Sequence, residues 1–327
     1  DIATPSTSAA SDTSTPNPNI YVIQLPHMMP SSLLFALWMD AMNITIHDHV
    51  IVYGTINCPF VFRAFWNIRT FHPPKKCHLL DGSLQDWIDA NGPIESPGVA
   101  PTYPIVSSSD LLLHHQQQEE NFVPSYRPRN AEYDGKKNIL SLKEIKEYVQ
   151  NGRIINAFPT RPNDENDDGP KIETKKKKWM MIVDARSSGR FEGVDDEPRP
   201  GLQKGHIPGS INLPFTMLLQ QSNQNRLLPR EELRSILHQY GLVGIGGCGS
   251  NGRAGDSQDG NDNEIMIVST CGSGVTASCL LAALTVVLED ESSSTNDVVV
   301  DEIGYLYDGS WIEWGDPRSN TPVVKSE

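Results

Sequence analysis

Apolar and polar residues alternate along this chain in blocks that predict strands, loops and helices in a repeating order. An apolar run at residues 265–269 is followed by a short glycine-containing loop and by a long apolar stretch at residues 275–288. A similar order occurs earlier, where residues 50–53 predict a strand and residues 60–71 predict a helix. Strands that alternate with helices in this way indicate an α/β fold with parallel strands.

A short internal repeat indicates that this unit is duplicated. Residues 81–87 and 308–314 share aspartate, glycine, serine, an acidic residue and tryptophan at identical spacing. Each repeat follows a strand–loop–helix unit, so we predict two related domains, each with a central, mostly parallel sheet flanked by helices. Superposing the two units places Gly54 opposite Cys271. The first unit is therefore predicted to be chemically inactive, with its nearby Cys58 in a packing role because the adjoining proline offers no N–H group.

Composition divides the chain into segments. Residues 1–19 are rich in Ser, Thr, Pro, Ala and Asn and predict a disordered tail. Residues 96–137 contain Pro, Ser and a His-Gln tract that is typical of a linker. We therefore predict an N-terminal domain at residues 20–95 and a C-terminal domain at residues 138–327.

The C-terminal domain contains two stretches that we interpret as insertions. Residues 163–178 join an acidic patch to a lysine run, and residues 244–263 are rich in Gly, Asp, Asn and Ser. A helix is predicted at residues 142–150, since Ser141 and Glu144 form a capping-box pattern. The chain does not begin with Met and its start lacks the basic and apolar segments of a signal peptide, so we interpret it as a fragment or a processed chain.

Charge and cysteine content exclude several classes of protein. A net charge of −14 argues against binding to nucleic acid or to a membrane surface, because both require basic patches. The five cysteines lack the spacing of a disulfide framework, which indicates a reducing compartment. The longest apolar stretch, around residues 279–288, is too short to span a bilayer. No metal-ligand spacing or phosphate-binding loop occurs, so we expect no metal and no cofactor.

Cys271 is the candidate nucleophile. It opens the run Cys-Gly-Ser-Gly-Val-Thr-Ala, between the predicted strand and the predicted helix. A cysteine placed there faces unpaired backbone N–H groups and the positive end of a helix dipole, and both favour the thiolate. The same amides form a concave site for an anion or for an extra sulfur atom. The loop therefore predicts persulfide chemistry, with buried packing as the alternative role for this cysteine.

Several separated motifs of the C-terminal half, taken in order, resemble the tandem-rhodanese sulfurtransferases, and among them the enzymes that use 3-mercaptopyruvate. These motifs lie at residues 182–186, 189–191, 197–201, 205–210, 271–277 and 307–311. The resemblance implies two rhodanese-like domains, a location in the cytoplasm or the mitochondrion, and sulfur transfer from 3-mercaptopyruvate to cyanide, a small thiol or thioredoxin, with release of pyruvate. Neutral Gly272 and Ser273 agree with it, because a dianionic donor such as thiosulfate would need positive charge after the cysteine.

The resemblance is weaker in the N-terminal half. The strand and helix that open the family's first domain are replaced here by residues 1–19, so we expect this domain to be truncated and less well packed. His27 matches a family stretch that reaches the active site from this half, and we keep it as a further candidate. The acidic partner that accompanies it in the family has no equivalent in the polar tail.

The resemblance assigns roles to individual residues of the C-terminal half. Cys271 would attack the substrate sulfur, Ser273 would relay a proton between the substrate thiol and the enolate, and Arg190 and Arg199 would hold the carboxylate and keto oxygen. The remaining positions of the loop would bind substrate. These are Gly272, Gly274, Val275 and Thr276.

Simpler roles stay open beside these. Arg190 and Arg199 are also compatible with surface arginines paired to the acidic residues 195–197. Ser273 would then only cap the following helix, which is a common role for serine at such a position.

Three other functions were weighed. A thiosulfate sulfurtransferase and a non-catalytic sulfur carrier or regulatory module remain alternatives, and turnover with mercaptopyruvate separates an enzyme from a carrier. A cysteine phosphatase is disfavoured, because it would need an arginine six positions after Cys271, where this chain has Ala277.

Overall fold

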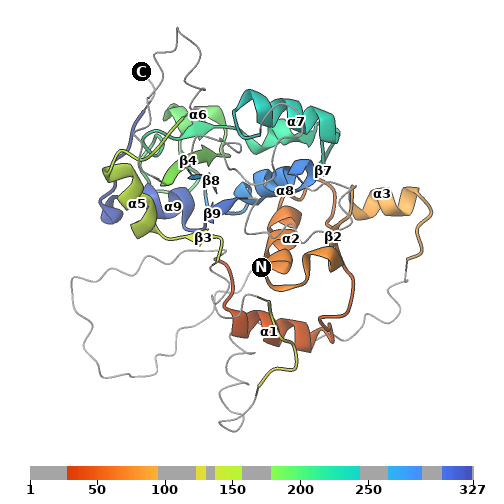
Figure 1. The fold of residues 1–327 in the computed structure, drawn as a ribbon. Coiled ribbons are helices and arrows are strands. Elements are labelled where there is room, and N and C mark those ends of the chain that lie inside the picture. Colours follow the sequence, from red (N-terminus) through yellow and green to blue (C-terminus); the bar gives the residue numbers. More distant parts are fainter. Residues whose placement is uncertain are drawn as a thin grey trace, which may run out of the picture.

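The computed structural model describes residues 28–94, 123–129, 137–156, 178–243, 264–288 and 304–325. Within them the chain forms an α/β fold whose C-terminal half is built on a parallel sheet (Figure 1). His27, the tail at residues 1–19, the stretch 244–263 and nearly all of 163–178 lie outside the described residues.

The C-terminal sheet has five strands, and every neighbouring pair of strands is parallel, as predicted. The order across the sheet is β3-β9-β8-β4-β5. The strand bounds are β3 (Ile139–Leu140), β4 (Lys178–Asp184), β5 (Ile211–Asn212), β8 (Glu264–Thr270) and β9 (Tyr305–Tyr307). The central pair, β4 and β8, stays in register over its whole length, from Lys178 opposite Glu264 to Asp184 opposite Thr270.

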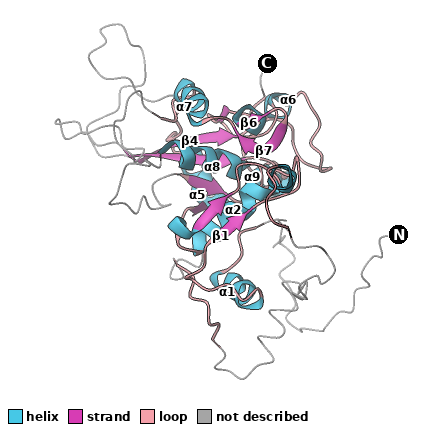
Figure 2. Cartoon of the chain, turned by 90° about the vertical axis from the view of Figure 1, so that its right-hand side faces the viewer, coloured by secondary structure: helices cyan, strands magenta, loops and turns pink. Residues whose placement is uncertain are grey.

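Helices cover both faces of this sheet, so its central strands are buried on both sides (Figure 2). Met181 and Ile267 point to the face packed by α7 (Arg230–Gln239) and α8 (Ala277–Leu288). Their neighbours on the strands point to the opposite face, which α5 and α9 pack. The remaining C-terminal elements are α5 (Leu142–Gln150), α6 (Ser188–Glu192), η4 (Phe215–Leu218), β6 (Leu219–Gln220), β7 (Asn223–Leu227), α9 (Ser310–Trp314) and η6 (Pro317–Ser319).

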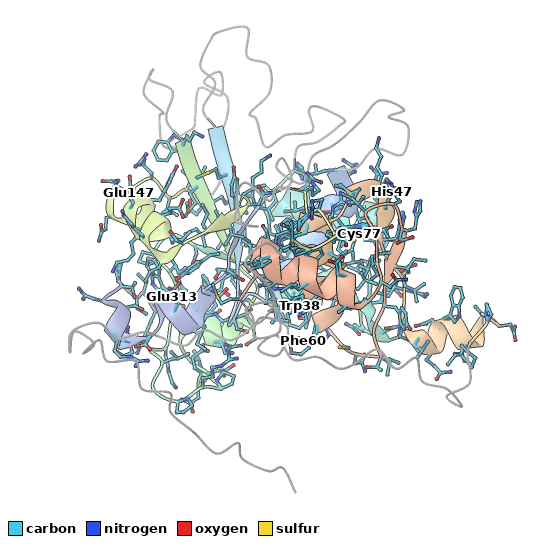
Figure 3. The ribbon with its side chains drawn as sticks, turned by 90° about the horizontal axis from the view of Figure 1, so that it is seen from below. Trp38, His47, Phe60, Cys77, Glu147 and Glu313 are labelled. Atoms are coloured by element: carbon cyan, nitrogen blue, oxygen red, sulfur yellow. The ribbon has the colours of Figure 1, made fainter. Side chains whose placement is uncertain are left out.

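The N-terminal half is smaller. Its two strands, β1 (Val50–Val52) and β2 (Cys77–Leu79), form a parallel two-stranded sheet. Its helices are α1 (Ser32–Ala41), α2 (Phe60–Phe71), η1 (Pro74–Lys76) and α3 (Leu84–Asp89). Figure 3 looks onto α1, on which Trp38 is labelled.

This half is packed unevenly. Ile51 in β1 and Tyr53 just after it are 57% and 55% exposed. In contrast, Phe62 and Trp66 of α2 are fully buried and share one apolar core with α8. The expectation of poor packing therefore holds for β1 and is wrong for α2, because α2 gains its core from the C-terminal half.

The two units share one backbone hydrogen bond at equivalent positions. The Leu84 N–H donates to the Gly54 carbonyl at 2.9 Å, and the Trp311 N–H donates to the Cys271 carbonyl at the same distance. Leu84 and Trp311 occupy the same position of the sequence repeat. The predicted equivalence of Gly54 and Cys271 is thus confirmed.

The predicted elements match the observed ones closely. The helices expected at residues 60–71 and 142–150 have those bounds, and the capping box of Ser141 and Glu144 is present. The helix that follows Cys271, α8, begins at Ala277, two residues later than the predicted start at residue 275. The turn of residues 275–279 causes this delay, since Val275 and Thr276 already accept backbone hydrogen bonds from the residues three positions on. No helix in the described ranges is long and apolar enough to cross a membrane.

Candidate active site

Cys271 lies directly after β8, where the start of α9 fixes the backbone. Its N–H donates to Ser310 Oγ at 3.2 Å, and its carbonyl accepts from the Trp311 N–H at 2.9 Å. Ser310 has a positive φ of 50° and donates its hydroxyl to the Tyr307 carbonyl. This serine therefore ties the end of β8 to the end of β9.

The sulfur of Cys271 is enclosed. The residue is 2% exposed, and within the described chain no hydrogen bond reaches its Sγ atom. The predicted contacts from loop amides to the sulfur are thus missing, because the loop is held by its carbonyls: those of Cys271 and Gly272 accept from Trp311 and Ile312. The amides of residues 272–276 donate no hydrogen bond to any described residue.

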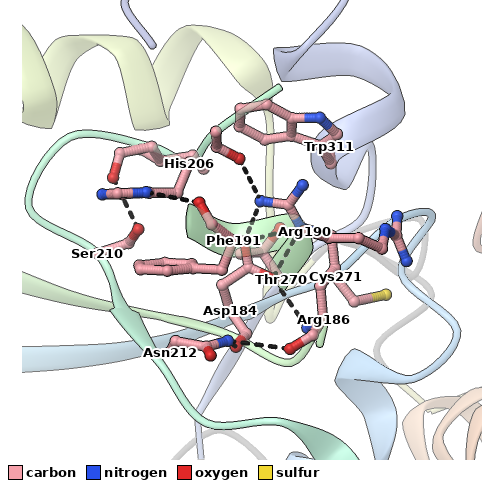
Figure 4. A network of polar contacts seen from close by, with 12 residues as sticks. Asp184, Arg186, Arg190, Phe191, His206, Ser210, Asn212, Thr270, Cys271 and Trp311 are labelled. Carbon is pink, nitrogen blue, oxygen red and sulfur yellow. Dashed lines mark hydrogen bonds and ion pairs between the residues drawn. The ribbon is translucent and has the colours of Figure 1, made fainter. Parts of the chain in front are cut away.

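Arg190 reaches the Cys271 loop (residues 271–277) from α6, and Figure 4 shows Arg190 together with Cys271. A Cβ atom on Gly272 would lie 3.1 Å from Arg190 Nη2, so a side chain at this position would crowd the guanidinium. Glu197 accepts from Arg190 Nη2 at 2.5 Å and from its Nε at 3.3 Å. The Arg190 side chain is still 22% exposed. The pairing with the acidic segment that was left open above is present here, and it occurs beside the loop.

Arg199 is placed differently. It follows α6 in a loop, is partly exposed, and forms no hydrogen bond or ion pair with any residue that the structure describes. Its assignment to the substrate carboxylate therefore rests on the resemblance.

Arg190 belongs to a buried charge cluster that also contains Arg186, Asp184 and Glu197. Arg186 pairs with Asp184 at 2.6 Å and with Glu197 at 2.8 Å, and it donates to the Gly205 carbonyl. Its guanidinium lies 4.1 Å from the centre of the Trp311 ring. Planar stacking and several charge-assisted bonds hold Arg186 rigidly, so Glu197 is also fixed.

The N-terminal half contributes a residue that the sequence analysis missed. Arg63 of α2 donates to Asp308 Oδ1 at 2.5 Å and to the Gly274 carbonyl at 3.3 Å. Both partners of this ion pair are almost fully buried. A charged residue within the largely apolar stretch of residues 60–71 was the signal available in the sequence.

Gly274 is glycine for structural reasons. Its φ is +77°, and an added Cβ would lie 3.0 Å from the Asp308 carbonyl oxygen and 3.2 Å from Arg63 Nη1. The residue therefore permits the close approach of Arg63 and Asp308 to the loop.

Ser273 lies in the loop two residues after Cys271. It is 9% exposed, and its hydroxyl forms no hydrogen bond with the described residues. The capping role considered for it is therefore not observed. Val275 is buried and Thr276 is partly exposed, and both belong to the turn that precedes α8.

Met29, two residues after His27, contacts the C-terminal half. The Met29 N–H donates to Asp308 Oδ2 at 2.7 Å, and the Met29 side chain packs against the main core. The segment that follows His27 thus reaches the same aspartate as Arg63.

Two of the other described cysteines, Cys77 and Cys279, are buried and unsuited to nucleophilic chemistry. Burial raises the pKa of Cys77 to about 12 and raises the pKa of Cys279 still further. Cys58 is partly exposed at the start of α2. No group of three or more potential metal ligands occurs among the described residues.

Comparison with protein families identifies the class of the C-terminal half. Residues 171–316 match the family model described as "Rhodanese-like domain". The class fits a sheet that delivers Cys271 to the start of a helix.

Over most of its length the chain is similar to 3-mercaptopyruvate sulfurtransferases. It is 29% identical to the enzyme of that name from Escherichia coli strain K12, over 91% of this chain and 76% of the relative. It is 27% identical to the Homo sapiens 3-mercaptopyruvate sulfurtransferase, over 88% of this chain and 69% of the relative. The resemblance inferred from the motifs is thus confirmed.

Two further comparisons extend this result. Arabidopsis thaliana thiosulfate/3-mercaptopyruvate sulfurtransferase 2 is 29% identical over 92% of this chain and 70% of the relative. The crystal structure of the Saccharomyces cerevisiae Tum1 protein superposes with a TM-score of 0.55 at 22% identity, covering 93% of this chain and 78% of that one. This second match shows a shared fold.

Proposed function

We propose that the chain is a sulfurtransferase that takes sulfur from 3-mercaptopyruvate through a persulfide on Cys271. The observation that carries the proposal is the combination of Cys271, a loop of free amides and the Arg190 guanidinium at the end of β8. Similarity to enzymes named for this substrate supports the choice of donor.

The first half-reaction is a transfer of neutral sulfur. The Cys271 thiolate attacks the sulfur of mercaptopyruvate, an S–S bond forms, and the C–S bond breaks with its electron pair going to carbon. The resulting enolate takes up the proton of the substrate thiol and becomes pyruvate, which leaves an ionised persulfide. Ser273 relays this proton, because its hydroxyl has no competing partner among the described residues.

The loop amides stabilise the product of this step. The amides of residues 272–276 are near Cys271 and are not used by the described structure. The terminal sulfur of a persulfide carries negative charge, and several N–H groups around it favour that charge. In this proposal the loop amides stabilise the outer sulfur of the persulfide, and not the resting Cys271 thiolate as predicted from the sequence.

The second half-reaction passes the outer sulfur to an acceptor and restores the Cys271 thiolate. Cyanide, a small thiol and reduced thioredoxin are the acceptors we propose. We propose the cytoplasm or the mitochondrion as its location. One Arabidopsis thaliana relative is named as mitochondrial.

Thiosulfate is the second candidate donor. Two Arabidopsis thaliana relatives are named for both donors, which favours this alternative. Against it, Gly272 and Ser273 are neutral, and Arg190 is paired with Glu197. A dianion next to this loop has less compensating charge than it requires.

Steady-state assays with cyanide as the acceptor test the proposal. Rates with mercaptopyruvate and with thiosulfate are compared over a range of donor concentrations. A higher kcat/KM for mercaptopyruvate with repeated turnover is expected, and a higher value for thiosulfate would assign the chain to the second candidate. Release of a single equivalent of pyruvate without turnover would indicate a sulfur carrier.

A further inference from the structure

Glu197 occupies a buried position between two arginines at the edge of the active site. Its side chain is 3% exposed, and its two oxygens accept from Arg190 Nη2 at 2.5 Å and from Arg186 Nη1 at 2.8 Å. Arg190 in turn lies against Gly272, next to Cys271. One carboxylate therefore pairs with the guanidinium that lies against Gly272, the residue next to Cys271.

The charges of this cluster cancel. Arg186 also pairs with Asp184 at 2.6 Å, so the two arginines face two carboxylates. On the other side of the loop, Arg63 and Asp308 form a second neutral pair. The described charged groups that hold the loop thus provide hydrogen-bond donors with no net positive charge.

We propose that Glu197 sets donor selectivity by neutralising Arg190, so that the site favours a monoanionic keto thiol over dianionic thiosulfate. This inference rests on the proposed function. Glu197 acts through Arg190 and is a positioning and charge-balancing residue. The two donors differ by one unit of negative charge, and removing a buried carboxylate adds one unit of positive charge beside the loop.

The effect of that added charge differs between the donors. Thiosulfate transfer breaks its S–S bond and releases sulfite with the electron pair, so the dianionic charge stays near Arg190 throughout the step. Mercaptopyruvate brings one negative charge and gains less from an extra cation. Coulomb attraction at a distance of several ångströms inside a protein is large enough to change relative rates by about tenfold.

The test compares Glu197→Gln, which keeps a hydrogen-bond acceptor but removes the charge, with Glu197→Asp, which keeps the charge. Glu192→Gln, on the exposed end of α6, is the matched control. For each variant, kcat/KM is measured for both donors with cyanide as the acceptor, at low and high ionic strength. Thermal unfolding reports whether each variant is folded.

In Glu197→Gln the ratio of kcat/KM for thiosulfate to that for mercaptopyruvate should rise about tenfold, and high salt should reduce the gain. Glu197→Asp and Glu192→Gln should keep the wild-type ratio. If kcat/KM of Glu197→Gln falls by the same factor for both donors, Glu197 has only a structural role and the inference is overturned. If Glu197→Gln does not fold, a tenfold change of the ratio in Glu197→Asp would also overturn it.

The wild-type enzyme separates this inference from the proposed function. If wild type fails to turn over mercaptopyruvate, the proposed function is wrong. If wild type prefers mercaptopyruvate and the ratio of the two kcat/KM values is the same in wild type and in Glu197→Gln, only the selectivity inference is wrong.

Discussion

Arg63 and Asp308 lie 245 residues apart in the sequence and form a buried ion pair at 2.5 Å beside the loop that carries Cys271. Arg63 also donates to the Gly274 carbonyl, and the Met29 N–H donates to the second oxygen of Asp308. The N-terminal half therefore helps to hold the loop that carries Cys271. A separate C-terminal half would lack these contacts.

Breaking this ion pair should affect stability and turnover together. Arg63→Met leaves Asp308 buried without its cation, and loss of one partner of a buried pair costs about 3–5 kcal/mol. We expect kcat to fall more than the KM for mercaptopyruvate changes, because the loop loses its support while Arg190 remains. Denaturant unfolding and steady-state kinetics measure the two effects.

A double-mutant cycle provides the control for that experiment. Arg63→Met combined with Asp308→Asn removes both charges, so the double variant should be less destabilised than the sum of the single variants. Strictly additive free energies of unfolding would show that the two side chains do not interact in solution.

Gly274 should not tolerate a side chain. Gly274→Ala places a Cβ 3.0 Å from the Asp308 carbonyl in a backbone conformation with a φ of +77°. Gly152→Ala is a matched control, since its φ is +61° and nothing lies within 4 Å of the added atom. Both variants pay the conformational cost of about 1–2 kcal/mol, and only Gly274→Ala should also lose most activity. Equal activity in the two variants would contradict the packing described for the loop.

Asp86 should make stability depend on acid pH. Hydrogen bonds from the Ser83 side chain and backbone, together with one from Asn223, lower the pKa of Asp86 to about 2 from its ordinary 3.8. A carboxylate with a depressed pKa stabilises the folded state fully above its unfolded pKa, and this contribution is lost as the pH falls from about 4 to about 2. Across that pH range, the free energy of unfolding should fall less in Asp86→Asn than in wild type. Parallel curves for the two proteins would contradict the assignment.

Thiol labelling should distinguish the cysteines. Cys77, with a pKa of about 12, and Cys279, whose pKa burial also raises, should resist iodoacetamide at pH 8 until the protein unfolds. After mercaptopyruvate, the iodoacetamide adduct at Cys271 should carry one additional sulfur atom, because the outer sulfur of the persulfide is alkylated, and the labelling of Cys58 should be unchanged. Peptide mass spectrometry identifies each site. Labelling of Cys77 in the folded protein at the rate of Cys58 would contradict the packing of β2.

Local patterns in the sequence were sufficient for much of the fold. The capping box of Ser141 and Glu144 set the start of α5, and the apolar runs set β8 and α2. The repeat correctly matched Gly54 with Cys271, because both units bind the following turn through the same backbone hydrogen bond. These features depend on neighbours in sequence, which periodicity and spacing report well.

Long-range pairing was harder to predict. Arg63 appeared only as a charge within an apolar helix, and nothing local indicated that Asp308 would face it. The repeat also concealed a divergence between its acidic residues. Hydrogen bonds lower the pKa of Asp86, whereas burial raises the pKa of Glu313 in the matching position. Such differences arise from tertiary surroundings, which identical spacing does not reveal.

The most direct test of the account is the fate of the donor sulfur. Wild type and Cys271→Ser are each incubated with one equivalent of mercaptopyruvate and no acceptor, then examined by intact and peptide mass spectrometry while pyruvate is assayed. The account predicts one additional sulfur atom on Cys271 and an equal amount of pyruvate in wild type, and neither in Cys271→Ser. Pyruvate released equally by the Cys271→Ser variant, or a persulfide on another cysteine, would contradict it.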